Sequence, residues 1–220
     1  MHGSDFLGLL TGGDHEALLA AGRPQAYKAG TVLCMEGEPS THIFILVSGW
    51  VKVITVTRDG REMLEALRGT GDVVGEIAGQ VTGYRTATIR AIGTVRALIV
   101  GSEQFGMFLD THPGAAQAHR RVMADQQRIA HEARRSHILA SGPQRLACLL
   151  LDLVARYSDG ALTAPLPLSQ EEIASLIGAS RSTVTRALHD WRSRRIIRTG
   201  QRHITILDQE RLRKIAGRSP

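Results

Sequence analysis

The stretch Ser169–Trp191 reads SQEEIASLIGASRSTVTRALHDW and predicts two short helices joined by a tight turn. Ser169 and Glu172 have the spacing of a capping box, which begins the first helix. Gly178 permits the left-handed turn that follows, and Ser180 is a candidate cap for the second helix. The stretch therefore has the pattern of a helix-turn-helix motif.

The second helix is predicted to have one apolar side and one polar side. The apolar residues are Val184, Ala187, Leu188 and Trp191, and the polar residues are Arg181, Ser182, Thr185, Arg186 and His189. The DNA major groove admits such a helix, and an arginine can donate two parallel hydrogen bonds to guanine O6 and N7. We therefore expect Arg181 or Arg186 to contact a base.

Hydroxyl groups and a basic hairpin flank this helix in the sequence. The candidates for hydrogen bonds to DNA phosphate oxygens are the hydroxyls of Ser169, Ser180, Ser182 and Thr183. The following stretch, RRIIRTGQRHITIL at 194–207, resembles a two-stranded wing around Gly200. Arginines of this wing, among them Arg202, can lie along the DNA backbone, and a third short helix capped by Asp208 is expected after it.

The excess positive charge of the chain lies in its last part. The formal net charge is +6, and residues 1–140 contain 14 Lys and Arg against 14 Asp and Glu, whereas residues 141–220 contain 13 against 7. A basic excess confined to one region indicates a polyanionic partner, most simply nucleic acid. An ordinary charged surface is the competing interpretation, but the caps, the turn glycine and the apolar side favour DNA binding.

Length and composition restrict the class of protein further. The 220 residues are enough for two small cores, and the apolar runs are shorter than the roughly 20 residues of a membrane helix, so we expect a cytoplasmic protein without a membrane partner. Cys34 and Cys148 are too few for an iron–sulfur cluster, and the histidines lack metal-ligand spacing, so neither metal nor haem is expected. The motifs of common enzymes are absent from the sequence, and we do not expect an enzyme.

Residues 27–100 have the pattern of an all-β domain. Short apolar and β-branched segments alternate with glycines such as Gly37, Gly49 and Gly71, which predicts a sandwich, barrel or jelly roll. Asp59 and Gly60 lie between VKVITVT and EMLEAL, and they predict a hairpin because Asp-Gly supplies the positive φ values of a tight turn.

The residues after Pro113 predict one long helix. The stretch 115–140 contains no Gly or Pro and is rich in Ala, Gln and Arg. Ala115, Val122 and Ile129 recur every seven residues, as in the seam of a dimeric coiled coil. Packing of the same residues on the helix's own domain is the alternative.

The stretch Gly75–Ala91 reads GEIAGQVTGYRTATIRA and places Glu76 and Arg85 nine positions apart. Two explanations are open at this point. The two charges form an internal ion pair, or Arg85 binds an anionic group of a ligand while Glu76 contacts another part of it.

Three stretches together resemble the Crp–Fnr family of bacterial transcription factors over nearly the whole chain. They are KAGTVLCMEGEPSTHIFILVSGWVKV at 28–53, the GEIA and RTATIRA segments of 75–91, and SQEEIASLIGASRSTVTRAL at 169–188. The resemblance implies an α+β fold. Its expected parts are an N-terminal cyclic-nucleotide-binding β-roll (a double-stranded jelly roll) at 1–112, a long dimerisation helix at 113–139 and a C-terminal winged helix-turn-helix domain at 140–220. The resemblance also favours a parallel dimer for the long helix.

The resemblance further implies a ligand site in the β-roll. Ligand-binding members carry a phosphate cassette of the form GE(L/I)A followed by R(S/T)A, and the matching residues here are Gly75, Glu76, Ile77, Ala78, Arg85, Thr86 and Ala87. Arg85 would bind the cyclic phosphate through its guanidinium, and Glu76 suits a ribose 2′-hydroxyl. The expected effector is a cyclic nucleotide, with cyclic AMP as the first choice.

Two positions depart from the family pattern. Members that bind cyclic AMP carry a Thr and a Ser near the adenine, where this chain has Ala130 and His131, although Arg128 or His131 can still reach a base edge. Ser182 replaces a Glu that usually accepts a hydrogen bond from cytosine N4. The operator preference is therefore expected to differ at a position ordinarily worth about 1–3 kcal/mol.

Together these observations predict a homodimeric, DNA-binding transcriptional regulator. Effector binding in the β-roll would promote binding of both recognition helices to a palindromic operator on double-stranded DNA, and RNA polymerase is an expected partner. Two alternatives stay open. One is a constitutive DNA-binding regulator with a vestigial ligand pocket, and the other is a nucleotide-binding interaction module whose basic domain contacts RNA or protein.

Overall fold

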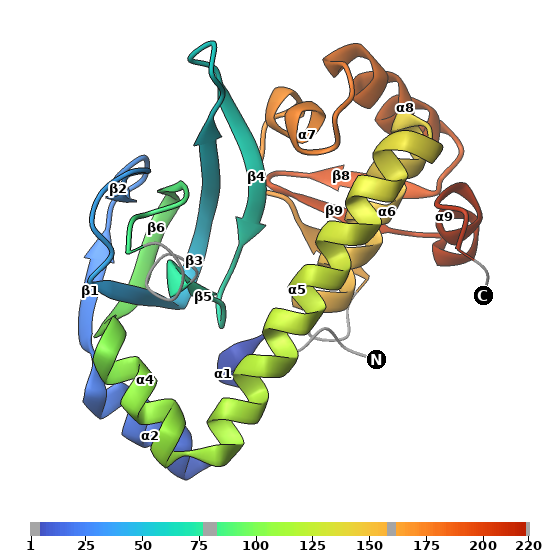
Figure 1. The fold of residues 1–220 in the computed structure, drawn as a ribbon. Helices are drawn as coiled ribbons and strands as arrows, with labels where there is room; N and C mark the ends of the chain where they lie inside the picture. The colour runs from blue at the N-terminus through green and yellow to red at the C-terminus, as the bar shows by residue number, and fades with distance from the viewer. Residues whose placement is uncertain (1–4, 77–82, 158–161, 219–220) are drawn as a thin grey trace. The chain divides into compact units, whose positions relative to one another are not determined.

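The computed structural model describes residues 5–76, 83–157 and 162–218 (Figure 1). The chain forms two compact units, Ser4–Ala124 and Asp125–Pro220. None of the described helices is both long enough and apolar enough to span a membrane.

The N-terminal unit contains an antiparallel sheet and helices. Its helices are α1 (Phe6–Leu9), α2 (Gly12–Ala21), α4 (Ser102–Thr111) and the first part of α5 (Pro113–Leu139), and its strands are β1 (Arg23–Tyr27), β2 (Val32–Cys34), β3 (His42–Val56), β4 (Glu62–Arg68), β5 (Val73–Val74) and β6 (Thr88–Gly101). The strand order is β1-β6-β3-β4, with β2 paired to β6 and β5 paired to β3. This arrangement confirms the predicted antiparallel β domain and the α+β class.

Strand β3 is longer than predicted because Gly49 lies inside it rather than between two strands. The residue has a φ of 96°, and the pairing of β3 with β6 shifts register on both sides of Ser48. A Cβ on Gly49 would lie 2.5 Å from the Thr94 carbonyl oxygen. Glycine is therefore needed at this position to form a bulge within a continuous strand. In the sequence, a glycine at such a bulge looks the same as a glycine at a turn between two strands.

The predicted hairpin joins β3 to β4, but its turn differs in detail. Gly60 has a positive φ of 80°, whereas the φ of Asp59 is not positive. Thr57 accepts a backbone hydrogen bond from Gly60, and its own amide donates to the Arg61 carbonyl. One positive φ value is thus sufficient, as in the longer hairpin loops that contain a bulge.

The first part of α5 packs on its own unit. Ala115, Ala118 and Val122 are 0%, 6% and 3% exposed, and they belong to one apolar core cluster with Phe6, Leu18 and residues of the sheet and α4. For Ala115 and Val122 the structure therefore contains the alternative, packing on their own unit, and not a dimer seam. Ile129, the third residue of the repeat, is half-buried, and dimerisation through the long helix stays a prediction. A seven-residue repeat marks an apolar side of a helix and does not say which partner covers it.

The C-terminal unit contains a helical core and a small sheet. Its elements after the second part of α5 are α6 (Gly142–Tyr157), β7 (Thr163–Pro165), α7 (Gln170–Leu176), α8 (Arg181–Ser193), β8 (Ile197–Gly200), β9 (His203–Ile206) and α9 (Gln209–Ile215). The sheet order is β7-β9-β8. Leu146 and Leu150 of α6 are fully buried, as are Ile196 and Leu212. The predicted helix-turn-helix, wing and final helix are confirmed, whereas β7 was not predicted.

Candidate ligand and DNA-binding sites

Arg85 is a buried cation in the N-terminal unit. Arg85 lies three residues before the start of β6 in the sequence, and it is only 4% exposed. Nη1 donates a hydrogen bond of 3.1 Å to the Gly75 carbonyl oxygen, and Nη2 donates one of 2.7 Å to the His42 carbonyl oxygen. The guanidinium carbon lies 5.5 Å from the centre of the Phe44 ring. Backbone carbonyls and an aromatic face therefore orient the guanidinium.

Glu76 is also buried, but it does not pair with Arg85. Glu76 is 5% exposed, and the hydrogen bonds that Arg85 makes within the described residues go to carbonyl oxygens and not to Glu76. Burial raises the pKa of the Glu76 carboxyl, and the Arg85 charge opposes this only as the smallest of several contributions. The alternative of an internal Glu76–Arg85 ion pair is therefore not what the structure contains.

A glycine is required at position 75 because the guanidinium of Arg85 lies close to its backbone. Gly75 has a φ of 88°, and an added Cβ would lie 2.4 Å from Arg85 Nη1. The other predicted contacts differ in exposure, since Thr86 is exposed and Ala87 is half-buried. Ile77 and Ala78 lie outside the described residues. The structure thus brings Gly75, Glu76 and Arg85 together, while the roles of these residues in ligand binding stay predictions.

The chemistry of this site suits an anion. A guanidinium carries five N–H groups, and two of them are used on described carbonyl oxygens. Burial of a positive charge without a carboxylate partner is costly, and a ligand anion would offset that cost. A phosphodiester matches the planar fork of donors in an arginine.

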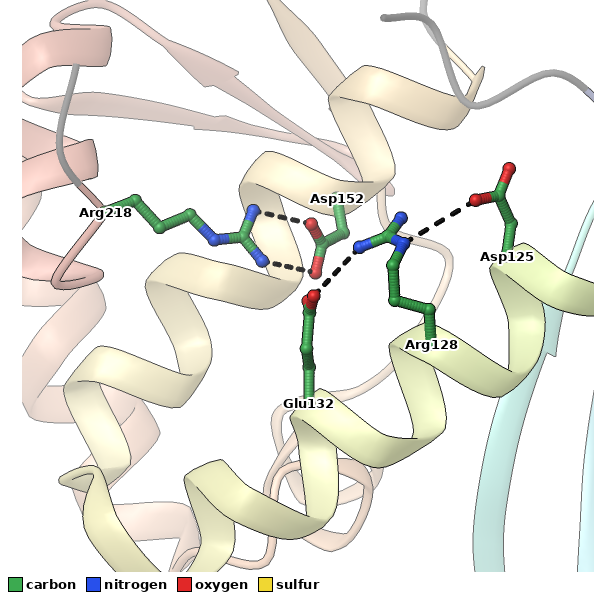
Figure 2. A network of polar contacts seen from close by, with 5 residues as sticks. All are labelled: Asp125, Arg128, Glu132, Asp152 and Arg218. Carbon is green, nitrogen blue, oxygen red and sulfur yellow. Dashed lines mark hydrogen bonds and ion pairs between the residues drawn. The ribbon is translucent and has the colours of Figure 1, made fainter.

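The predicted base contacts, Arg128 and His131, lie on the second part of α5, which belongs to the C-terminal unit. Both residues are exposed. Arg128 donates a 2.9 Å hydrogen bond to Glu132 and lies 3.6 Å from Asp125 (Figure 2). Arg128 is therefore already held by two carboxylates of its own helix, and its contact with a ligand stays a prediction.

A second charged pair lies near Glu132 in the same unit. Arg218 donates hydrogen bonds of 2.6 and 3.0 Å to the two carboxylate oxygens of Asp152 on α6. Figure 2 shows Glu132 extending from α5 toward this pair. The pKa of Arg218 is raised, first by the hydrogen bond to Asp152 and also by the charge of Glu132. The pair fastens the C-terminal end of the chain to α6.

The helix-turn-helix caps have the predicted geometry. The Ser169 hydroxyl accepts from the Glu172 amide at 3.2 Å, and the Glu172 carboxylate accepts from the Ser169 amide at 2.8 Å. Gly178 has a φ of 59°, and the Ser180 hydroxyl accepts from the Thr183 amide at 3.1 Å. These contacts confirm the predicted capping box, the turn glycine and the cap of α8.

The two sides of α8 are also as predicted. The buried residues are Val184, Ala187, Leu188 and Trp191, and the exposed residues are Arg181, Ser182, Thr185, Arg186 and His189. Thr183 is half-buried. The apolar side holds α8 in the unit and leaves the arginines accessible, while their contacts with DNA stay predictions.

Several predicted phosphate contacts are already hydrogen bonded to one another. The Ser180 hydroxyl lies 2.9 Å from the Ser182 hydroxyl and 2.8 Å from the Thr183 hydroxyl. The Thr185 hydroxyl donates to the side-chain oxygen of Gln170 at 2.6 Å. Gln170 was not among the predicted site residues, although its place directly after the Ser169 cap was a usable signal.

A crevice separates the start of α7 from the wing. Its volume is about 330 Å³, and its lining includes Ser169 and Gln170 on one side and Gly200, Arg202 and His203 on the other. Arg202 has a φ of 60° at the turn between β8 and β9. The structure therefore places two predicted DNA-contacting residues, Ser169 and Arg202, on the wall of one crevice.

Comparison with known families agrees with both halves of this description. Residues 24–112 match the family described as Cyclic nucleotide-binding domain, and residues 144–215 match the family described as Crp-like helix-turn-helix domain. The chain is thus a DNA-binding regulator of the class that carries these two domains. Among the described residues, no group of three His, Cys, Asp or Glu is placed to hold a metal ion.

Individual relatives cover most of the chain. It is 34% identical over 197 residues to a CRP-like cAMP-activated global transcriptional regulator of Mycobacterium tuberculosis, with 88% of each chain covered. It is 25% identical over 206 residues to the transcriptional activator protein FnrA of Stutzerimonas stutzeri, with 91% of this chain and 82% of FnrA covered. The structure of FixK2 from Bradyrhizobium japonicum matches with a TM-score of 0.78 at 22% identity, covering 90% of this chain and 99% of FixK2. The chain belongs to the Crp–Fnr family of transcriptional regulators.

Proposed function

We propose that the protein is an effector-responsive, homodimeric regulator that binds an anionic nucleotide through Arg85 and DNA through α8. The observation that carries the ligand half is the buried Arg85 guanidinium, whose hydrogen bonds within the described residues go to two carbonyl oxygens and not to a carboxylate. In this division, residues 1–112 bind the effector, 113–139 form the dimer, and 140–220 bind DNA.

A cyclic nucleotide is the proposed effector. The match of residues 24–112 to the cyclic nucleotide-binding family supports this class of ligand. The relative from Mycobacterium tuberculosis is cAMP-activated, which favours cyclic AMP as the first compound to test. In the proposed complex Arg85 binds the cyclic phosphate, and Glu76 accepts a hydrogen bond from the ribose 2′-hydroxyl once it is ionised.

A palindromic operator is the proposed DNA partner. Two α8 helices of a dimer, spaced by about 34 Å, would enter successive major grooves on one side of the duplex. Ala115, Ala118 and Val122 are covered within their own unit, so the dimer contacts on α5 must involve other residues. Ile138 and Leu139 at the end of α5 are 83% and 77% exposed and are candidates. RNA polymerase is the proposed downstream partner.

Titration calorimetry with cyclic AMP and cyclic GMP tests the ligand half. The wild-type protein is compared with Arg85→Gln and with Arg90→Gln, because Arg90 is an arginine of β6 that pairs with Glu62 at 2.7 Å on the surface. Saturable binding that is lost in Arg85→Gln and kept in Arg90→Gln supports the proposal. Absence of binding in the wild-type protein supports instead a regulator with a vestigial pocket.

A further inference from the structure

Arg145 joins two separate places in the C-terminal unit. This residue of α6 donates hydrogen bonds from Nη1 to the Ala140 carbonyl oxygen at 2.5 Å, from Nε to that of Ile177 at 2.6 Å, and from Nη2 to that of Gly178 at 2.8 Å. Ala140 lies between α5 and α6, whereas Ile177 and Gly178 form the turn between α7 and α8. One guanidinium therefore connects the end of the long helix to the turn of the helix-turn-helix.

The three acceptors explain why arginine occupies this position. The last carbonyl groups of a helix lack partners within the helix and carry partial negative charge. Ala140 follows α5, and Ile177 and Gly178 follow α7. A guanidinium presents several N–H groups in a rigid plane and can serve two helix ends at once, whereas a lysine is a single flexible point charge.

A close approach of the backbone supports the same connection. A Cβ on Gly142, the first residue of α6, would lie 2.7 Å from Thr183 Cγ2 and 3.4 Å from Ala179 Cβ. The connection between α5 and α6 thus packs directly against the turn and the start of α8. No local pattern in the sequence indicates this arrangement, because Arg145 and Ile177 are 32 positions apart.

We propose that Arg145 is a positioning residue that fixes the recognition helix α8 relative to the end of α5. The proposal rests on the proposed function, because its consequence is selective binding of an operator. Arg145 is half-buried, and its Nε, Nη1 and Nη2 are all engaged with carbonyl groups, so it acts through the turn and not through contact with DNA. A shift of the α5 end would be transmitted to α8 through these hydrogen bonds.

Two variants and a matched control test this role. Arg145→Met keeps a long apolar stem and removes every donor, and Arg145→Lys keeps the charge without the planar fork. Arg218→Met is the control, because Arg218 is also half-buried in this unit but binds Asp152 and not the helix-turn-helix. If Arg145→Met does not fold, Arg145→Lys takes its place in the hydrogen-exchange and DNA-affinity measurements described next.

The first measurement is amide hydrogen exchange without DNA. The amides of Gly178 and Ala179, which donate to Ser175 and Ala174, are expected to exchange about tenfold faster relative to Leu150 in Arg145→Met. The second is the ratio of affinities for a duplex selected from random DNA by the wild-type protein and for a scrambled duplex. This ratio is expected to fall about tenfold in Arg145→Met, less in Arg145→Lys, and not in Arg218→Met.

The two measurements separate the possible failures. Wild-type exchange at the turn in Arg145→Met overturns the proposal, and so does faster exchange with an unchanged affinity ratio, because Arg145 would then only stabilise the fold. If the wild-type protein selects no duplex, the proposed function fails, and the exchange result alone still supports or overturns the connection made by Arg145.

Discussion

Replacing Gly75 with alanine is expected to displace the Arg85 guanidinium and so weaken effector binding. The added Cβ would lie 2.4 Å from Arg85 Nη1, a separation that real Cβ atoms do not adopt, so the guanidinium must move. Movement breaks the hydrogen bond from Nη1 to the Gly75 carbonyl oxygen. The substitution therefore acts on the proposed phosphate contact without removing the positive charge.

The expected magnitude combines two costs. A non-Gly residue at the φ of 88° costs about 1–2 kcal/mol of folding free energy. Loss of one hydrogen bond to a charged group costs about 1.5–3 kcal/mol. The unliganded variant is thus expected to be less stable by about 2.5–5 kcal/mol, and the misplaced guanidinium is expected to weaken nucleotide binding about 10- to 100-fold.

Gly30→Ala is the matched control for backbone strain. Gly30 has a φ of 79° in the same unit, but a Cβ there would meet no atom within 4 Å. Thermal unfolding should show a loss of about 1–2 kcal/mol for Gly30→Ala, with nucleotide affinity unchanged in calorimetry. Wild-type nucleotide affinity in Gly75→Ala would refute the role given to the Gly75–Arg85 contact.

Three further outcomes are expected. Burial raises the pKa of Glu76, which means that the folded state favours the protonated, uncharged carboxyl group. The contribution of Glu76 to folding stability is therefore fully present below about pH 4 and is lost as pH rises through the folded-state pKa. Glu76→Gln, which stays uncharged, should raise the unfolding temperature at pH 7 and not at pH 4, and an equal increase at both pH values would contradict this. Ser180→Ala should cost about 1 kcal/mol in denaturant unfolding, whereas equal losses in Ser180→Ala and Ser182→Ala would refute the capping role. Arg186→Ala should weaken binding of the selected duplex by about 1–3 kcal/mol with unchanged nucleotide affinity, and unchanged duplex binding would exclude it as a base contact.

The helix-turn-helix could be predicted in detail because its signals are local. The Ser169–Glu172 capping box, the turn at Gly178 and the Ser180 cap each depend on residues within a few positions of one another. The apolar side of α8 follows from helical periodicity alone. Such features need no knowledge of the rest of the fold.

The β domain could be predicted only in outline. Whether Gly49 ends a strand or forms a bulge depends on the pairing of β3 with β6, and those strands are far apart in the sequence. β1 was missed because RPQAY contains a proline and lacks a clear alternation. The repeat of Ala115 and Val122 indicated an apolar side of α5 but not that the sheet and helices of the same unit would cover it.

The sequence singled out Gly75, Glu76 and Arg85, which the structure brings together, but it did not indicate the contacts that Arg85 makes. Arg85 was expected to bind an anion, yet its orienting partners are backbone carbonyl groups, one of which lies 43 positions away at His42. Every residue presents a similar backbone carbonyl group, so the sequence carries no signal for such acceptors. The same reason hid the contacts of Arg145.

The most direct test of the central claim measures DNA affinity with and without nucleotide. Fluorescence anisotropy with the selected duplex, at one fixed salt concentration, compares the wild-type protein and Arg85→Gln in the absence and presence of saturating cyclic AMP or cyclic GMP. We expect one of these nucleotides to tighten wild-type binding about 5- to 150-fold and to leave Arg85→Gln unchanged. Equal wild-type affinity under all conditions would contradict coupling between the buried arginine and the recognition helix.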